Sequence, residues 1–115
     1  MGKYVGILKE RRPAILTREL YERHIAYLQD TSNRGALVLV GPLKDQDRVL
    51  QIIQADTRET AETILTEDPF VSQGYFGAYE LYELMESNAA NNWLRDTPPG
   101  PGDAAESVKP PAGFR

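Results

Sequence analysis

Residues 35–55 read GALVLVGPLKDQDRVLQIIQA, two apolar runs joined by a short polar segment. Ala36 to Val40 is continuous and apolar, so we predict a buried central strand that ends at Gly41-Pro42. Val49 to Ala55 is the next predicted strand. Because only the polar turn Asp45 to Asp47 separates the two runs, they are expected to pair as an antiparallel hairpin.

A helix is predicted before this hairpin. Thr17 has the side chain of an N-cap, and Glu19 follows in the first turn, where the helix dipole favours an anion. The helix is expected to reach about Asn33 and to end at Arg34-Gly35. Its apolar side chains recur at three- and four-residue spacing and form one stripe: Leu20, Tyr21, His24, Ile25, Tyr27 and Leu28.

A second helix is predicted after the hairpin. Asp56 and Glu59 resemble a capping box at its start, and Asp68-Pro69 ends it because a residue before proline is pushed out of helical conformation. Its buried side is expected to be Ala61, Ile64 and Leu65.

Two outer strands complete the pattern. Tyr4 to Leu8 is a short apolar run closed by a charged segment and Pro13, and Tyr75 to Met85 is a longer aromatic-rich run released by Gly74. The order strand, helix, strand, strand, helix, strand predicts an α+β, ferredoxin-like antiparallel sheet with both helices on one face. The uncovered face would be hidden against a second copy, as in a dimeric α+β barrel.

The end of the chain has a different character. From Glu86 the sequence is Asn-rich around Trp93 and then rich in Pro and Gly, a composition that cannot bury enough apolar surface to fold alone. We therefore predict a domain over residues 1–86 and a polar extension over 87–115. Trp93, Leu94 and Phe114 are costly to leave in water, so docking of the extension on the domain or on a partner is the alternative to a free tail.

Composition excludes several classes of protein. The net charge is −4, and only Lys9, Arg11 and Arg12 approach a basic cluster, which argues against nucleic-acid or membrane partners. There is no cysteine and one histidine, so no metal or cofactor site is expected. The first residues lack a leader pattern and no stretch has the length of a membrane span, so we expect a cytoplasmic protein.

His24 is the natural candidate for proton transfer, because histidine alone titrates near neutrality without perturbation. A single histidine on an apolar helix face is more often an ordinary core residue. Asp68, before Pro69, is by local criteria a turn former. If the two helices lie side by side, however, Asp68 can approach His24, and a carboxylate that accepts from one imidazole nitrogen sets the tautomer and leaves the other to accept a proton.

Other residues are candidates to hold a substrate. Four aromatic side chains are predicted to line the cleft, with ordinary core packing as the alternative for each: Tyr4, Tyr27, Phe70 and Tyr75. Arg12 can pair with an anionic oxygen, although a loop arginine is usually only solvated. Gly41 would let a substrate approach the backbone, and Ser72 is at most a hydrogen-bonding group.

Several fragments together resemble the YCII family: the early Tyr-Val strand, His24 within RHIAYL, GAL leading to VGPL, and Asp68 within DPFV followed by Gly74. The resemblance runs from about Tyr4 to Leu84. It implies a ferredoxin-like domain that dimerises through its sheets, with a His/Asp pair at His24 and Asp68. A recognised activity of such proteins is cofactor-free dehydrochlorination of a chlorinated hydroxyhydroquinone, and their barrel resembles that of muconolactone isomerases.

The sequence thus leads to a hypothesis and its rivals. We expect a cofactor-free lyase or isomerase, with dehydrochlorination as one option, that acts on a small oxygenated aromatic or lactone-type metabolite. Its proton would be moved by His24 and Asp68. The alternatives are a non-catalytic binding or accessory dimer, and a barrel enzyme of another chemistry such as cofactor-free oxygenation.

Overall fold

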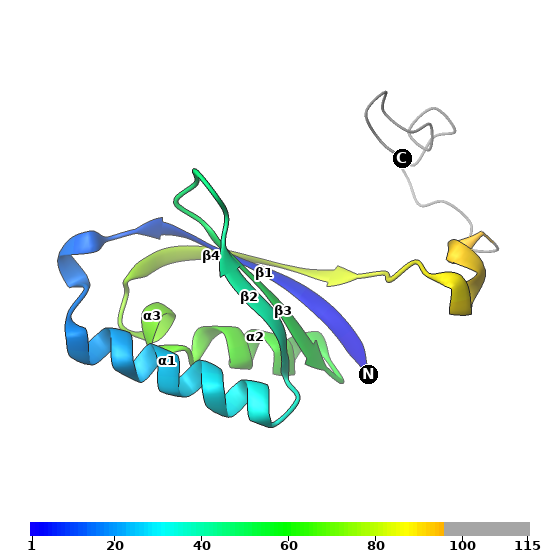
Figure 1. Ribbon diagram of the computed structural model, residues 1–115, viewed down its shortest axis with the longest axis horizontal. Helices are drawn as coiled ribbons and strands as arrows, with labels where there is room; N and C mark the ends of the chain where they lie inside the picture. Colours follow the sequence, from blue (N-terminus) through cyan, green and yellow to red (C-terminus); the bar gives the residue numbers. More distant parts are fainter. Residues whose placement is uncertain (96–115) are drawn as a thin grey trace. The chain divides into compact units, whose positions relative to one another are not determined.

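The computed structural model describes residues 1–95, and the Pro- and Gly-rich stretch with Phe114 lies outside that range. Met1–Met85 form one compact unit (Figure 1). The main elements of this unit are four strands and two longer helices, and their bounds are β1 Gly2–Arg11, α1 Arg18–Asn33, β2 Leu37–Pro42, β3 Val49–Ala55, α2 Arg58–Thr66 and β4 Phe76–Leu84. Two single-turn helices add to these: η1 Pro13–Ile15 and α3 Pro69–Ser72.

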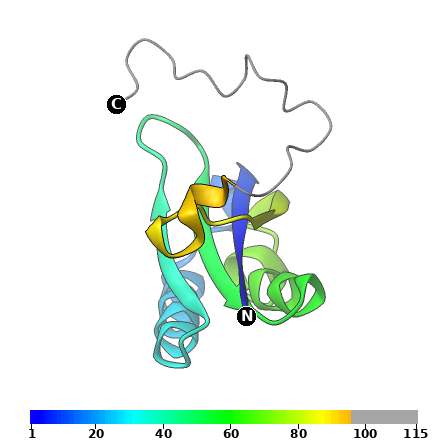
Figure 2. The ribbon, with the colours of Figure 1, turned by 90° about the vertical axis from the view of Figure 1, so that its right-hand side faces the viewer.

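The four strands form one antiparallel sheet in the order β2-β3-β1-β4. Both α1 and α2 lie on the same side of it (Figures 1 and 2). This strand order with helices on one face is the ferredoxin-like arrangement, so the predicted α+β class is confirmed.

The position of β2 corrects one prediction. Its run of apolar residues was interpreted as a buried central strand, but β2 is an edge strand that pairs only with β3. Val38 and Leu39 are about half exposed. Pro42 belongs to the strand instead of ending it, since an edge position tolerates a residue that has no N–H to donate.

The helix termini confirm one predicted cap and correct another. The Thr17 hydroxyl accepts the Leu20 N–H at 3.0 Å, as an N-cap does. At α2 the cap is Thr57 and not Asp56: the Thr57 hydroxyl accepts the Thr60 N–H, and Thr57 has the extended backbone that an N-cap requires. Sequence spacing alone does not tell two adjacent polar residues apart at such a boundary.

The core lies between the sheet and α2. Leu8, Ile53, Ala61 and Leu65 are fully buried there. Gly6 on β1 makes this packing close, because a Cβ at that position would lie 2.8 Å from Leu65 Cδ1. The glycine is therefore required by the approach of α2 to the sheet.

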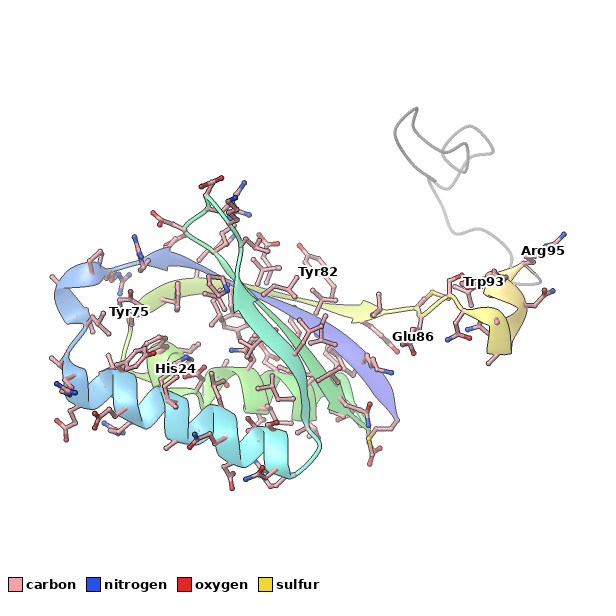
Figure 3. All side chains as sticks on the ribbon, in the orientation of Figure 1. His24, Tyr75, Tyr82, Glu86, Trp93 and Arg95 are labelled. Carbon is pink, nitrogen blue, oxygen red and sulfur yellow. The ribbon has the colours of Figure 1, made fainter. Side chains whose placement is uncertain are left out.

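Within residues 1–85, no helix covers the opposite face of the sheet (Figures 1 and 2). Tyr4, Gly6 and Leu8 point toward the helices, so the alternate residues Val5 and Ile7 lie on the other face. Tyr82, the partner of Val5 across the sheet, is 56% exposed and points away from the helices (Figure 3). Among residues 1–95, no helix combines the length and the apolar character needed to cross a bilayer.

The second unit begins at Glu86. Its described part contains the short helix η2, Ala89–Leu94, where Asn88 and Asn91 form a reciprocal capping box. Trp93 belongs to this helix, and its docking on the domain or on a partner stays a prediction.

Candidate active site

A buried hydrogen bond joins α1 to the chain after α2. His24 Nδ1 lies 2.7 Å from Asp68 Oδ1, and the side chains are 9% and 1% exposed. Within residues 1–95, no second polar partner of His24 is found, yet no buried side-chain nitrogen is left unsatisfied. Nε2 is therefore accessible from outside the packed core, while Nδ1 is held by the carboxyl group.

The position of Asp68 follows from local sequence. Because Pro69 disfavours helical backbone at the preceding residue, α2 ends at Thr66 and Asp68 is extended, with φ −57° and ψ 127°. From there Asp68 Oδ1 accepts the Phe70 N–H at 2.9 Å and caps α3. Asp68 is thus a turn former, as its local sequence predicts, and at the same time the partner of His24.

Two further groups hold the pair in place. Gln51, nearly fully buried on β3, donates from Nε2 to Asp68 Oδ2 at 3.3 Å. The Phe70 ring stacks on the His24 imidazole with the centroids 3.7 Å apart and the planes 4° from parallel. The imidazole is fixed by a hydrogen bond at one edge and by a ring on one face, which leaves it little freedom to rotate.

His24 opens onto a pocket of about 330 Å³ between α1 and the sheet. Its wall is mainly apolar, and apart from His24 it is formed by Tyr21, Ile25, Leu28, Val40, Gly41, Pro42, Val49, Phe70 and Phe76. This volume is at the lower end of the range of about 300–1,000 Å³ for small-molecule sites. An apolar pocket with one proton-accepting group suits a small, largely apolar ligand.

A larger hollow of about 590 Å³ runs between α1 and β2 but does not include His24. It is lined by the outer parts of α1 and the edge strand, including Val38 and Leu39. Since it contains no residue of the His24–Asp68 pair, we place the candidate site in the smaller pocket.

Some predicted substrate-binding residues do lie at this pocket. Gly41 and Phe70 line it. Tyr75 lies at the same end of the domain as His24 (Figure 3) and packs on Phe70, with ring centroids 4.6 Å apart. Tyr75 lines an adjoining hollow that shares Phe70 with the first.

Four other predicted residues lie elsewhere. Tyr4 is a core residue on β1, and Ser72 is exposed at the end of α3. Tyr27 donates its hydroxyl to the Ile64 carbonyl at 2.6 Å, and burial, with nearby Glu67 and Asp68, raises its pKa to about 12. The Arg12 guanidinium lies over Gly77, where a Cβ would come within 2.7 Å of it. None of the four lines the pocket of His24.

Sequence reasoning missed Gln51, Tyr21, Val49 and Phe76. Gln51 had a detectable signal: it is a polar residue at an inward position of β3, between Val49 and Ile53, which are inward and apolar. A polar side chain at such a position needs a buried partner. The wall residues gave no signal, because only the gap between α1 and the sheet makes them pocket residues.

No cluster of three or more metal-ligating side chains occurs in the described part of the chain. His24 itself offers proton transfer and hydrogen bonding at its Nε2 atom.

Residues 3–88 match the model of the YCII-related domain family. The chain belongs to this family. A search of curated proteins found no match. Among solved structures, the YCII-related chain is similar to a 5-chloro-2-hydroxyhydroquinone dehydrochlorinase from Burkholderia phenoliruptrix in complex with 2,5-dihydroxybenzoquinone. The TM-score is 0.60 at 22% identity, over 78% of this chain and 99% of the other, a similarity that establishes the common fold.

Proposed function

We propose that this YCII-related protein is a cofactor-free acid/base enzyme, a lyase or isomerase, that acts on a small oxygenated aromatic or lactone-type metabolite. The observation that carries the proposal is the accessible Nε2 of His24, in a pocket, on an imidazole whose Nδ1 is held by buried Asp68. A positioned base whose tautomer is set by a carboxylate is the arrangement that general base catalysis requires.

His24 takes or gives the proton at Nε2. Asp68 does not touch the substrate: it orients the ring and stabilises the imidazolium that forms when the base is protonated. Phe70 holds the imidazole plane from one side, and Gln51 occupies the second carboxyl oxygen of Asp68. The proton is therefore exchanged only at the atom that faces the pocket.

The substrate class is supported by the wall of the pocket and by a relative of the same fold. The apolar wall suits a ring, and the dehydrochlorinase of Burkholderia phenoliruptrix is named for a chlorinated ring, 5-chloro-2-hydroxyhydroquinone. Loss of a proton and chloride from such a ring, or migration of a double bond in a lactone, needs one proton-transfer group. Dehydrochlorination is therefore one option within the proposed class.

Homodimerisation through the open sheet face is part of the proposal. That face carries apolar side chains from all four strands, among them Leu39, Ile52, Tyr82 and Leu84, three of which are 40–56% exposed. Contiguous exposed apolar surface of this kind usually marks an interaction site. Size-exclusion chromatography with light scattering should give twice the chain mass of 12.9 kDa.

The experiment is a thermal-shift screen of phenols, quinones and lactones, including 2,5-dihydroxybenzoquinone, with product analysis of every compound that binds. On any compound that is converted, His24→Gln should lower kcat by about 10²–10⁴-fold, because it removes the general base. Asp68→Asn should lower kcat by a similar factor, because it no longer sets the tautomer of that base. Thr66→Val is the control, since it changes a polar side chain close to Asp68 but outside the pocket.

A second readout distinguishes orientation from folding. His24 is the only histidine, so ¹⁵N-histidine labelling gives one pair of ring signals. In the wild-type protein the neutral ring should carry its proton on Nδ1, and Asp68→Asn should change the ratio of the two tautomers. Full activity in either variant would contradict the proposed pair.

The competing function is a non-catalytic dimer that binds a metabolite or acts as an accessory subunit. The pocket alone favours binding as much as catalysis. Compounds that bind without any conversion would favour this alternative, and oxygen consumption during turnover would favour an oxygenase.

A further inference from the structure

A second, smaller compartment adjoins the pocket of His24. This compartment has a volume of about 190 Å³ and shares four wall residues with the first: Pro42, Val49, Phe70 and Phe76. The shared residues include two aromatic rings, and Tyr75 packs against both of them. The two compartments therefore meet at an aromatic wall.

The chemistry of the two compartments differs. His24 is the one ionisable side chain among the residues that line the first, apart from the Tyr21 phenol. Apart from the Tyr75 phenol, four residues with polar or charged side chains line the second, which are Arg11, Gln46, Asp47 and Arg48. Arg11 Nη2 is 2.9 Å from Asp47 Oδ1, so these two charges offset each other.

Arg48 is the remaining charged residue of the second compartment. Within the described residues Arg48 makes no ion pair. It helps to lower the pKa of the Glu80 carboxyl on β4, but Glu80 is already held by Lys9 and Tyr82. The Arg48 backbone is held just before β3, where its carbonyl accepts the Leu43 N–H at 2.9 Å.

We propose that the substrate carries a carboxylate, which Arg48 binds in the second compartment while the ring lies on the aromatic wall and its reacting position faces His24. An arginine fork matches a carboxylate with two parallel hydrogen bonds, and Gln46 adds a neutral donor beside it. The inference deepens the proposed function and rests on it for the identity of the reacting end. It names a hydroxylated aromatic acid where the proposed function names only an oxygenated ring.

The test is a matched pair of probes, gentisate and its methyl ester, which have the same hydroxylated ring and differ in the negative charge. Binding to the full chain is measured by isothermal titration calorimetry at low and moderate salt. The wild-type protein should bind gentisate about tenfold or more tightly than the ester, and salt should weaken only the binding of gentisate.

Arg48→Gln should bring the two affinities within about twofold of each other and leave binding of the ester unchanged. Arg18→Gln is the matched control, because it removes the same charge from an exposed position on α1 that lines neither compartment. Arg11→Gln should also weaken binding of gentisate, since it frees the Asp47 charge beside the carboxylate.

Three results would overturn the inference: equal wild-type affinities for the two probes, a preference that survives Arg48→Gln, and no binding of either probe at millimolar concentration. Its failure is distinguishable from failure of the proposed function. A wild-type protein that prefers gentisate through Arg48 but converts no aromatic acid would support the carboxylate site and contradict the enzyme.

Discussion

The two long helices lie on the same face of the sheet but pack on it differently. In α2, Ala61 and Leu65 are fully buried and contribute to the core. In α1, which is nearly twice as long, the buried residues are Leu20, His24 and Thr31, two of them polar. Tyr21, part of the predicted apolar stripe, is 51% exposed.

The difference explains where the protein has room for chemistry. At α2, Gly6 lets the helix approach until Leu65 fills the space against β1. At α1, two hollows remain between the helix and the sheet, and His24 lines one of them. The α2 side stabilises the fold, and the looser α1 side is where a small molecule can enter.

Of the variants that test this difference between the helices, Leu65→Ala is expected to change the free energy of unfolding most. Truncating a fully buried leucine removes apolar contact and leaves a cavity, so the free energy of unfolding should fall by about 3 kcal/mol. Leu28→Ala on α1 should cost about 1 kcal/mol, because that side chain is half-buried and already borders a hollow. Urea denaturation measures both, and equal losses would show that the two helices pack alike.

Gly6→Ala should cause the next largest loss of stability. The new methyl would lie 2.8 Å from the fully buried Leu65 side chain, so we expect a loss of about 2 kcal/mol. Gly41→Ala is the control, since nothing lies within 4 Å of its Cβ position, and it should change stability by less than about 0.5 kcal/mol. A harmless alanine at position 6 would mean that the approach of α2 does not depend on glycine.

A smaller effect is expected at the link between the two helices, the Tyr27 hydroxyl on the Ile64 carbonyl. Tyr27→Phe should cost about 1 kcal/mol near pH 8. Because the folded state raises the pKa of Tyr27 from 10.0 to about 12, the bond stabilises the protein fully below pH 10 and its contribution is lost as the pH rises toward 12. The difference between variant and wild type in thermal unfolding should shrink over that range; a constant difference would count against the bond.

The smallest effect is expected from Val49→Ile, which adds one methyl group at the wall shared by the two compartments. Filling space on the loose side should stabilise the protein by up to about 0.8 kcal/mol. The same methyl should weaken the binding of gentisate measured by calorimetry. Stabilisation with unchanged binding would place the ligand outside these compartments.

Local sequence signals predicted the elements well. Thr17 marks the start of α1, Gly35 follows its end with a φ of 78°, and the polar turn around Asp45 separates β2 from β3. These signals act over a few residues, so they can be read without the rest of the fold. The position of β2 was mispredicted because a run of apolar residues indicates only that a strand is apolar. It does not tell a central strand from an edge strand.

The candidate site was predicted in part. His24 and Asp68 are 44 residues apart, and only the resemblance to the family and the assumption of adjacent helices brought them together. Gln51, Tyr21 and Arg48 were not assigned to the site. Gln51 lies on β3 and Arg48 directly before it, and no spacing along the chain relates either to His24. Tyr21 lies one turn before His24 on α1, but the spacing alone does not show that the stripe borders a pocket.

The sequence by itself determined which segments are helix and strand, where most of them begin, and that the chain has one histidine and no thiol to carry its chemistry. The tertiary structure decided which residues meet: that Asp68 and Phe70 fix the His24 ring, and that Arg48 lies at the end of the same aromatic wall. The physical reason is the separation along the chain over which each interaction acts. Capping and periodicity act between near neighbours in the chain, whereas a site depends on how closely distant elements pack.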